Sequence, residues 1–446
     1  MLEPAALPAR AQRTNEASRR SAAEVGGVSA ATLWAGVAAA LFLFSFGVLH
    51  YGFYTRDVLA DTPIYSTYGH AILDGRVPYR DFAVEYPPGA LPVFALPAAM
   101  TPGGGYGPYV VAFEWLMALC GAVLAATVAF LLAKRERPRR TLAAAVALVG
   151  IAPVALGPVV VSRFDLWPAA LTAVALAALT LKRWRLALAV LGVAVAAKLY
   201  PAVLVGPALV YVWRRAGRRE AVVAGGVLVG TIALLFAPFL VLAPDGVVAS
   251  VTGQASRPLQ IESLGAAVLI AIHHLAGVAL SVESSHGSQN LAGGAATTTA
   301  LVQAILQSLA ILFVWVWFVR GPARTERLFR ACAGALAAFV AFGKVLSPQF
   351  LLWLLPLVPL VRGRRGIAAG ALLGSAFVLT QLWFPYRYMA LAYEFDPLAS
   401  WLVLVRDLLL VGLFVVIASP ARAWVARTLS AGRSGRSGSP SPCRPA

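Results

Sequence analysis

The residues best suited to chemistry lie in one polar, aromatic stretch of the sequence, from about Gly52 to Gly107. Carboxylates accept hydrogen bonds from hydroxyl groups, and an ionised carboxylate can take the proton of an attacking hydroxyl. Tyrosine rings offer apolar faces to the apolar side of a pyranose ring. In and directly before this stretch are the carboxylates Asp61, Asp74, Asp81 and Glu85 and the tyrosines Tyr51, Tyr54, Tyr65, Tyr68, Tyr79 and Tyr86. This mixture is typical of a site that binds a sugar.

Asp61 stands just before a predicted helix. The segment 64–73 has apolar residues at helical spacing, so it can lie along a membrane surface as an interfacial helix. The sequence Asp-Thr-Pro also suits the start of a helix, because aspartate is a favoured N-cap and proline a favoured first residue. Two roles therefore stay open for Asp61, as a catalytic carboxylate and as a helix cap.

The elements that must position these residues are membrane helices. Of the 446 residues, 60% are hydrophobic and 13% are charged, and the mean hydropathy is +0.77. Soluble domains are about half apolar and about one quarter charged. A helix needs about 20 apolar residues to cross a bilayer core about 30 Å thick, and long apolar runs recur along the chain. The sequence therefore predicts an all-α polytopic membrane protein.

Positive charge is concentrated between the apolar runs. The formal net charge is +18, and arginines gather in short loops such as 134–140 and 214–220. Basic loops mark the cytoplasmic side of a membrane protein, so we expect no nucleic-acid partner. The three cysteines lack the spacing of a disulfide framework or a thiolate metal site. We expect neither a cofactor nor a metal.

The basic loops predict about eleven or twelve transmembrane segments with both termini in the cytoplasm. Residues 1–29 are predicted to form a basic cytoplasmic tail, and residues 421–446 a disordered basic cytoplasmic tail. Residues 30–420 form one transmembrane domain, whose large first outer loop spans 52–107. The run 264–280 is predicted to be a re-entrant or outer-face helix. We expect a multi-pass protein of the cell inner membrane, with the polar loop on the outer face.

Proline interrupts two apolar stretches that lie between basic loops, at 198–201 and 347–349. Because both flanks of each stretch are basic, each is predicted to form two short helices. Backbone groups freed at such breaks cannot face lipid, so they must line protein or a wet cavity. Lys198 and Lys344 lie just before the breaks, where a charge either snorkels to the surface or faces a cavity.

Two arginines on the outer side are further candidate cations. Arg163 lies at an outer turn beside Asp165, where an ion pair holding two helices is the simple alternative to a site. Arg257 lies in a later outer loop. The pattern of the loop 284–287 predicts no role for it.

Several motifs resemble glycosyltransferase family 87, whose members are membrane mannosyltransferases of the GT-C superfamily. Asp61 is followed by Tyr65 and then by LDGRVPY, RDF and EYPPG, in the order of the family's first-loop signature. Similar segments follow at 162–169 (SRFDLWPA), 198–204 (KLYPAVL) and 347–356 (SPQFLLWLLP). The resemblance covers about residues 30–420 and implies a GT-C-like helical bundle whose first outer loop carries interfacial helices.

The resemblance further implies transfer of mannose or a related hexose from a polyprenyl-phosphate donor to a lipid, glycan or protein acceptor on the outer face. Inversion at the anomeric carbon requires one carboxylate to take the acceptor's proton, and Asp61 fits the role of general base. The departing phosphate needs positive charge, for which the candidates are Lys198, Arg163, Lys344 and Arg257. The candidate sugar- or acceptor-binding residues are Tyr65, Tyr79, Asp81, Glu85, Tyr86 and Gln349.

Two other functions stay open. A transporter or flippase of a lipid-linked sugar also uses broken helices, but here the carboxylates and tyrosines gather on one outer loop rather than at the middle of the bilayer. A scaffold protein of the membrane would leave the loop carboxylates without a role.

Overall fold

The computed structural model describes residues 29–53, 59–135 and 137–419, and helices make up most of this chain. Among these residues, six helices are long and apolar enough to cross a membrane. They are α2 (Ala30–Val48, continued by the π-helical turn η1, Leu49–Phe53), α5 (Tyr106–Lys134), α12 (Arg218–Leu242), α15 (Gly294–Val319), α17 (Gly363–Trp383) and α19 (Pro397–Ala418). The predicted helical multi-pass membrane protein is confirmed. Apart from Ser29, the two predicted tails lie outside the described residues.

Shorter helices fill the bundle between the long ones. They are α6 (Arg139–Gly150), α7 (Ala152–Leu156), α8 (Val159–Ser162), α9 (Leu166–Thr180), α10 (Trp184–Ala197), α11 (Val205–Ala216) and α16 (Thr325–Ala341). Within the bundle α2 packs along α5, α10 packs against both α9 and α12, and α17 packs along α19. Their buried faces are mainly alanine, leucine, valine and phenylalanine, so close packing of apolar side chains holds the scaffold of the site.

Both proline breaks are present in the structure. After α10, the chain leaves the helix at Lys198 and makes the 3₁₀ turn η3 (Tyr200–Leu204) before α11 begins. At the second break only the first half, α16, is an α-helix. The second half consists of the 3₁₀ helices η4 (Pro348–Leu354) and η5 (Val358–Leu360), so the predicted second short helix is present with 3₁₀ geometry. The three prolines of this segment supply no backbone N–H, which removes donors that an α-helix would need.

The long loop after α2, predicted to lie on the outer side, folds back onto the bundle. It contains α3 (Thr62–Leu73), the 3₁₀ turn η2 (Pro88–Ala90) and α4 (Leu91–Met100). A side chain at Gly89 would lie 2.6 Å from the backbone of Ala196 and Ala197, so only glycine permits this approach. Trp167 Nε1 donates a hydrogen bond to the Gly89 carbonyl at 3.1 Å. The EYPPG motif thereby brings the loop against the break at Lys198.

A small antiparallel sheet of order β1–β3–β2 departs from the predicted all-helical pattern. Its strands are β1 (Leu259–Gln260), β2 (Ser281–Ser285) and β3 (Ser288–Ala292). The loop that had no predicted role is the turn of the β2–β3 hairpin. His286 and Gly287 occupy this turn with φ of 53° and 64°, the left-handed conformation of a tight two-residue hairpin turn.

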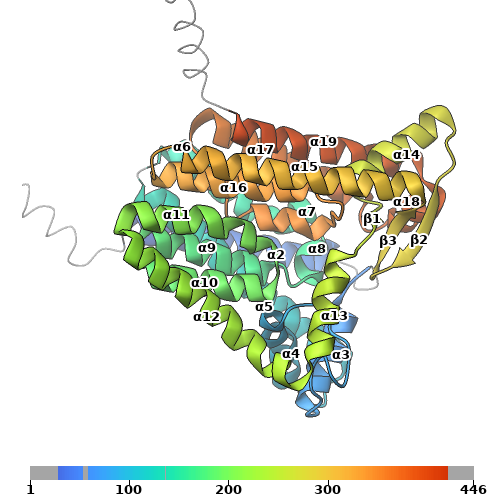
Figure 1. Cartoon of the computed structure of the whole chain (residues 1–446), viewed down its shortest axis with the longest axis horizontal. Coiled ribbons are helices and arrows are strands. Elements are labelled where there is room, and N and C mark those ends of the chain that lie inside the picture. Colours follow the sequence, from blue (N-terminus) through green and yellow to red (C-terminus); the bar gives the residue numbers. More distant parts are fainter. Residues whose placement is uncertain (1–28, 54–58, 136, 420–446) are drawn as a thin grey trace, which may run out of the picture.

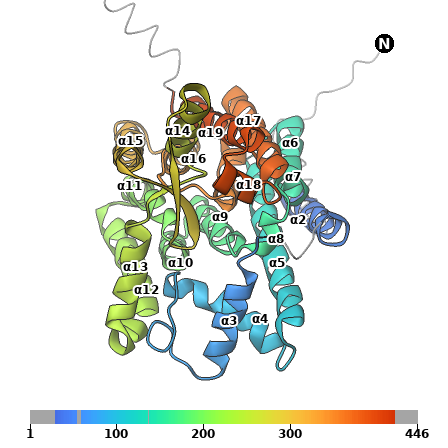
Figure 2. The same ribbon diagram turned by 90° about the vertical axis from the view of Figure 1, so that its right-hand side faces the viewer.

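The sheet lies at one end of the long helices. At this end are also α13 (Pro244–Ala255), α14 (Leu264–Ala276), which is the helix predicted at 264–280, and α18 (Tyr388–Glu394). Figure 1 shows the sheet, α14 and α18 together there. Seen from that end in Figure 2, the sheet stands among α13, α18 and α3. The polar elements of the chain therefore gather over one end of an apolar bundle.

Candidate functional site

Asp61 directly precedes α3, but its side chain makes no capping hydrogen bond to the helix. Instead, its Oδ1 lies 2.7 Å from Nη1 of the buried Arg163, and its Oδ2 accepts a hydrogen bond from the Tyr65 hydroxyl at 3.2 Å. Burial, with smaller effects of nearby Tyr86 and Asp61, raises the pKa of Tyr65 well above its usual value, so this hydroxyl keeps the proton that it donates. Two side chains therefore orient a carboxylate that is still about one quarter exposed, at 27%.

Asp165 is buried and pairs with a different cation. Its Oδ1 accepts hydrogen bonds from Lys198 Nζ at 2.7 Å and from Trp353 Nε1 at 2.5 Å. Arg163 and Asp165, two residues apart in the sequence, thus take separate partners instead of forming the simple ion pair considered above. Through these two pairs, the motif at 162–169 contacts both the carboxylate of Asp61 and the ammonium group of Lys198.

Lys198 does not extend to the surface. Its ammonium group lies over aromatic rings, with the ring centre of Phe164 at 4.6 Å and that of Trp353 at 5.3 Å. The rings of Tyr86 and Phe350 lie slightly farther away, each at 5.9 Å. Ring faces attract a cation, so this arrangement stabilises a charge that is largely shielded from water.

Two cavities meet beside these pairs. The first, which we name the carboxylate cavity, has a volume of about 340 Å³ and a mostly polar lining. It is lined by six of the predicted site residues: Asp61, Glu85, Tyr86, Arg163, Arg257 and Gln349. The second, the lysine cavity, has a volume of about 410 Å³ and a mostly apolar lining that contains Lys198, Lys344 and Arg257. Glu85, Tyr86, Arg257 and Gln349 line both cavities, so the two share a wall.

The two remaining cations of this region are held by backbone and hydroxyl groups. Lys344 Nζ donates to the Ala255 carbonyl at 3.0 Å, at the end of α13. Arg257 Nη2 donates to Ser288 Oγ at 3.1 Å and to the His286 carbonyl at 3.4 Å, both in the hairpin. Neither cation has a carboxylate within ion-pair distance among the described residues. Their charge is thus available to an anion in the lysine cavity.

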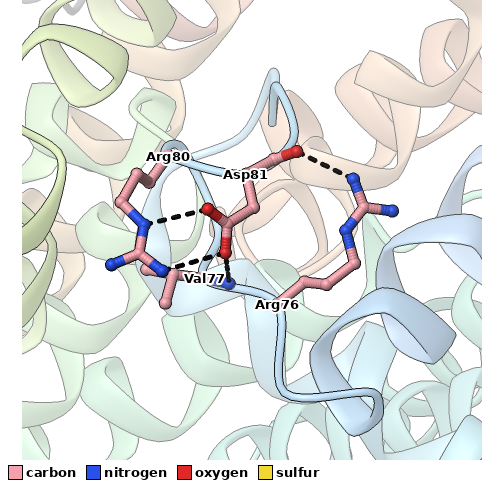
Figure 3. Close-up of polar contacts among 4 residues, drawn as sticks. All are labelled: Arg76, Val77, Arg80 and Asp81. Atoms are coloured by element: carbon pink, nitrogen blue, oxygen red, sulfur yellow. Dashed lines mark hydrogen bonds and ion pairs between the residues drawn. The ribbon is translucent and has the colours of Figure 1, made fainter.

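Tyr79 and Asp81 line a hollow between the first loop and α13 instead of either cavity. Asp81 accepts hydrogen bonds from the Val77 N–H at 2.7 Å and from Arg80 Nε at 2.9 Å, and its carbonyl accepts one from Arg76 at 2.8 Å (Figure 3). The Arg80 side chain and then the Val77 N–H lower the pKa of Asp81 to about 2. The Tyr79 hydroxyl donates to the Tyr86 carbonyl at 2.6 Å. These bonds shape the loop that carries Glu85 and Tyr86.

Some residues of the carboxylate cavity were not selected by the sequence analysis. They are Gln260 and Glu262 around β1, Ser284 to Gln289 of the hairpin except Ser285, Ser347 beside the second break, and Tyr388. Glu262 is 1% exposed, and burial raises its pKa to about 8 despite Arg406 and Arg163 nearby. Burial and then the charge of Asp61 also raise the pKa of Glu85. The sequence signal that could have pointed to Glu262 is the rarity of acidic residues, of which the whole chain has 19.

The family model of glycosyltransferase family 87 matches residues 84–348. The chain belongs to this family. The match covers the EYPPG motif, both charged pairs except Asp61, and the chain up to the second break; Asp61 and Tyr65 lie just upstream of it. This family member is therefore a membrane glycosyltransferase, as its motifs predicted.

The fold was also compared with solved structures. It is similar to ArnT from Cupriavidus metallidurans bound to undecaprenyl phosphate, with a TM-score of 0.46 and 15% identity over 86% of this chain and 76% of that one. It is similar as well to the Archaeoglobus fulgidus oligosaccharyltransferase in its apo form, with a TM-score of 0.42 and 13% identity over 91% of this chain. The alignment spans 58% of that enzyme's length. No curated protein sequence matches this chain.

Proposed function

We propose that this glycosyltransferase moves mannose or a related hexose from a polyprenyl-phosphate donor to a hydroxyl group of a lipid, glycan or protein acceptor, with inversion. The observation that carries the proposal is the shared wall between a polar cavity at Asp61 and an apolar, cationic cavity at Lys198. A donor of this class has an apolar tail, an anionic phosphate and a polar sugar. The two cavities together offer a matching surface to each part.

The donor's phosphate is assigned to the lysine cavity. Lys198, Lys344 and Arg257 can donate charge-assisted hydrogen bonds to its oxygens, and the apolar lining suits the first isoprene units of the tail. Asp165 supports this assignment, because it holds the Lys198 ammonium group in place before a phosphate arrives. The sugar would then lie at the shared wall, near Glu85, Tyr86 and Gln349.

Asp61 is assigned as the general base. The acceptor's hydroxyl oxygen attacks the anomeric carbon while its proton passes to the Asp61 carboxylate. On the opposite face the bond from the anomeric carbon to the phosphate oxygen breaks, and its electron pair leaves with the lipid phosphate. We assign Arg163 to positioning Asp61 rather than to the phosphate, since it pairs with Asp61 and lines only the carboxylate cavity.

The catalytic end is assigned to the outer face of the cell inner membrane. The opposite ends of α11 and α15 meet in a basic region, where Arg214 donates hydrogen bonds to the Val319 and Gly321 carbonyls. Arg135, after α5, pairs with Glu326 at the start of α16. Because arginine-rich loops stay in the cytoplasm, this distribution of charge supports an outward-facing site.

The test is to incubate the purified chain with labelled polyprenyl-phosphate sugars and a panel of glycan and lipid acceptors. We expect consumption of the mannose donor with formation of an inverted glycoside, and loss of both in the Asp61→Asn variant. Movement of the intact lipid-linked sugar across proteoliposomes without donor consumption would instead establish the transporter alternative. Donor consumption that persists in folded Asp61→Asn protein would remove Asp61 from the mechanism.

A further inference from the structure

Two buried polar side chains of the carboxylate cavity each have one oxygen without a partner. Glu262 is 1% exposed and Gln289 is 9% exposed, and both line this cavity. Glu262 Oε1 and Gln289 Oε1 have no hydrogen-bond partner among the described residues. Because a buried polar atom is costly when it lacks a partner, two such atoms at one cavity wall favour the binding of a polar ligand there.

The other ends of both side chains are fixed. Glu262 Oε2 accepts a hydrogen bond from Gln260 Nε2, which also donates to Ser347 Oγ at 2.9 Å. Gln289 Nε2 donates to Ser284 Oγ at 3.3 Å and to the Tyr393 hydroxyl at 3.2 Å. The unpartnered oxygens are therefore the atoms of these two groups that make no hydrogen bond within the described chain.

The backbone brings the segments that carry Glu262 and Gln289 close together. The N–H of Ile261, adjacent to Glu262, donates to the Gln289 carbonyl at 3.1 Å. The buried Arg406 of α19 donates to the Glu262 carbonyl at 2.8 Å. A helix, strand β3 and the segment after β1 thus fix the spacing of Glu262 and Gln289, as a specificity pocket requires.

The chemistry of the two oxygens is complementary. Gln289 Oε1 is a carbonyl oxygen and can only accept a hydrogen bond. Burial raises the pKa of Glu262 to about 8, so near neutral pH its carboxyl group keeps a proton that it can donate. One acceptor beside one donor suits two neighbouring hydroxyl groups of a sugar, since each hydroxyl can both donate and accept.

The position of Glu262 and Gln289 indicates whether they bind the donor or the acceptor. Glu262 and Gln289 line the carboxylate cavity with Asp61 but do not line the lysine cavity, to which the donor phosphate is assigned. The group that Asp61 deprotonates belongs to the acceptor. A ligand that contacts Asp61, Glu262 and Gln289 together is therefore the acceptor.

We propose that Glu262 and Gln289 bind two hydroxyl groups of a sugar unit in the acceptor, beside the hydroxyl that Asp61 deprotonates. The acceptor is thus a glycan or glycolipid whose terminal sugar enters the carboxylate cavity. This inference rests on the proposed function, because it assigns an acceptor to that reaction.

Kinetics of the purified chain test the proposal. The donor is a labelled polyprenyl-phosphate mannose, and the acceptor probes are methyl α-mannopyranoside, with several hydroxyls, and 1-propanol, with one. We expect Glu262→Ala and Gln289→Ala each to raise KM for the glycoside about tenfold, the loss of one good hydrogen bond. Rates with 1-propanol should not follow this change. The matched control is Glu283→Gln, since Glu283 is exposed on β2 and lines none of the cavities.

The outcomes separate the alternatives. An equal loss of transfer activity with both acceptors, or a rise in the KM for the donor instead, would place Glu262 and Gln289 at the donor sugar and overturn the proposal. Unchanged glycoside KM in both folded alanine variants would overturn it as well. Glu262→Gln keeps the bond to Gln260 and offers an amide N–H, so its KM for the glycoside should stay near that of the wild type. A rise in this KM as large as in Glu262→Ala would contradict the role of Glu262 as a hydrogen-bond donor.

Binding without turnover distinguishes failure of this inference from failure of the proposed function. Saturation-transfer NMR can follow methyl α-mannopyranoside on the Asp61→Asn protein. A signal that disappears in the Asp61→Asn, Gln289→Ala double variant supports the sugar-binding role even if no donor of the panel is consumed. A signal unchanged by Gln289→Ala would count against the role even in an active enzyme.

Discussion

The carboxylate of Asp61 forms an ion pair with Arg163 at 2.7 Å, across about 100 residues of sequence, while the side chain leaves its own helix uncapped. The pair joins the start of α3 to the turn between α8 and α9. Its geometry gives Asp61 a fixed orientation at the edge of the carboxylate cavity, and the same turn carries Asp165 toward Lys198. Two adjoining charged pairs thus organise the site.

Replacing Asp61 by asparagine should abolish sugar transfer while leaving the protein folded. Asparagine can still accept the Tyr65 hydrogen bond but cannot take a proton, so we expect kcat to fall by about 10²- to 10⁴-fold. Radiolabel transfer measures activity, and thermal unfolding in detergent measures folding. Asp74→Asn is the matched control, because Asp74 is exposed at the end of α3 and lines none of the cavities; a comparable loss there would mean that the effect is not specific to Asp61.

Lys198→Met should affect stability and donor binding separately. The substitution leaves the buried Asp165 without its cation, and breaking such a pair costs about 3–5 kcal/mol. The double variant Lys198→Met, Asp165→Asn should recover most of the unfolding temperature but keep a raised donor KM, because the ammonium group is still missing.

Lys134→Met is the control for that experiment, since Lys134 lies at the end of α5 and stacks on Phe130, away from both cavities. Recovery of donor KM in the double variant would contradict the assignment of Lys198 to the phosphate. Unfolding temperature and donor KM, measured on the same preparations, decide between the two roles.

The buried Glu262 should make stability depend on pH. Its pKa is about 8 in the folded protein against a usual value of 4.5, so the folded state holds a proton that the unfolded state releases between these values. The contribution is complete below the lower value, falls as pH rises through the interval, and is gone above about 8. The slope for one such proton is at most about 1.4 kcal/mol per pH unit.

Unfolding temperatures of the wild type and Glu262→Gln, measured from about pH 5 to 9, check this dependence. The unfolding temperature of the wild type should fall relative to that of Glu262→Gln as pH rises, because glutamine does not titrate. Parallel pH profiles for the two proteins would show that Glu262 is not protonated in the fold.

The orientation of the site can be tested by chemical labelling. Glu283→Cys on the hairpin should react with a membrane-impermeant maleimide in right-side-out vesicles, whereas Arg320→Cys after α15 should react only once the vesicles are permeabilised. Both positions are exposed, and the native Cys120 and Cys332 are buried. Cys443 is replaced by serine in both proteins. The reverse pattern of labelling would put the cavities on the cytoplasmic side.

The sequence by itself determined the helical membrane fold, both proline breaks and the family. Crossing helices are readable because lipid forces each segment to satisfy its backbone hydrogen bonds internally, so apolar length alone specifies them. Asp61, Lys198 and Lys344 could be selected as candidates from the sequence, since charged residues beside apolar runs are rare in this chain. Their family motifs lie in short contiguous stretches.

Only the tertiary structure decided which charges pair and which polar residues share a cavity. Arg163 pairs with Asp61 and not with its neighbour Asp165 because α3 and the α8–α9 turn meet in space, a contact that no local pattern encodes. The β2–β3 hairpin escaped prediction because its strands lack apolar alternation and are held by long-range contacts with β1 and α18. Glu262 became a candidate only when packing buried it, since burial is a property of the whole fold.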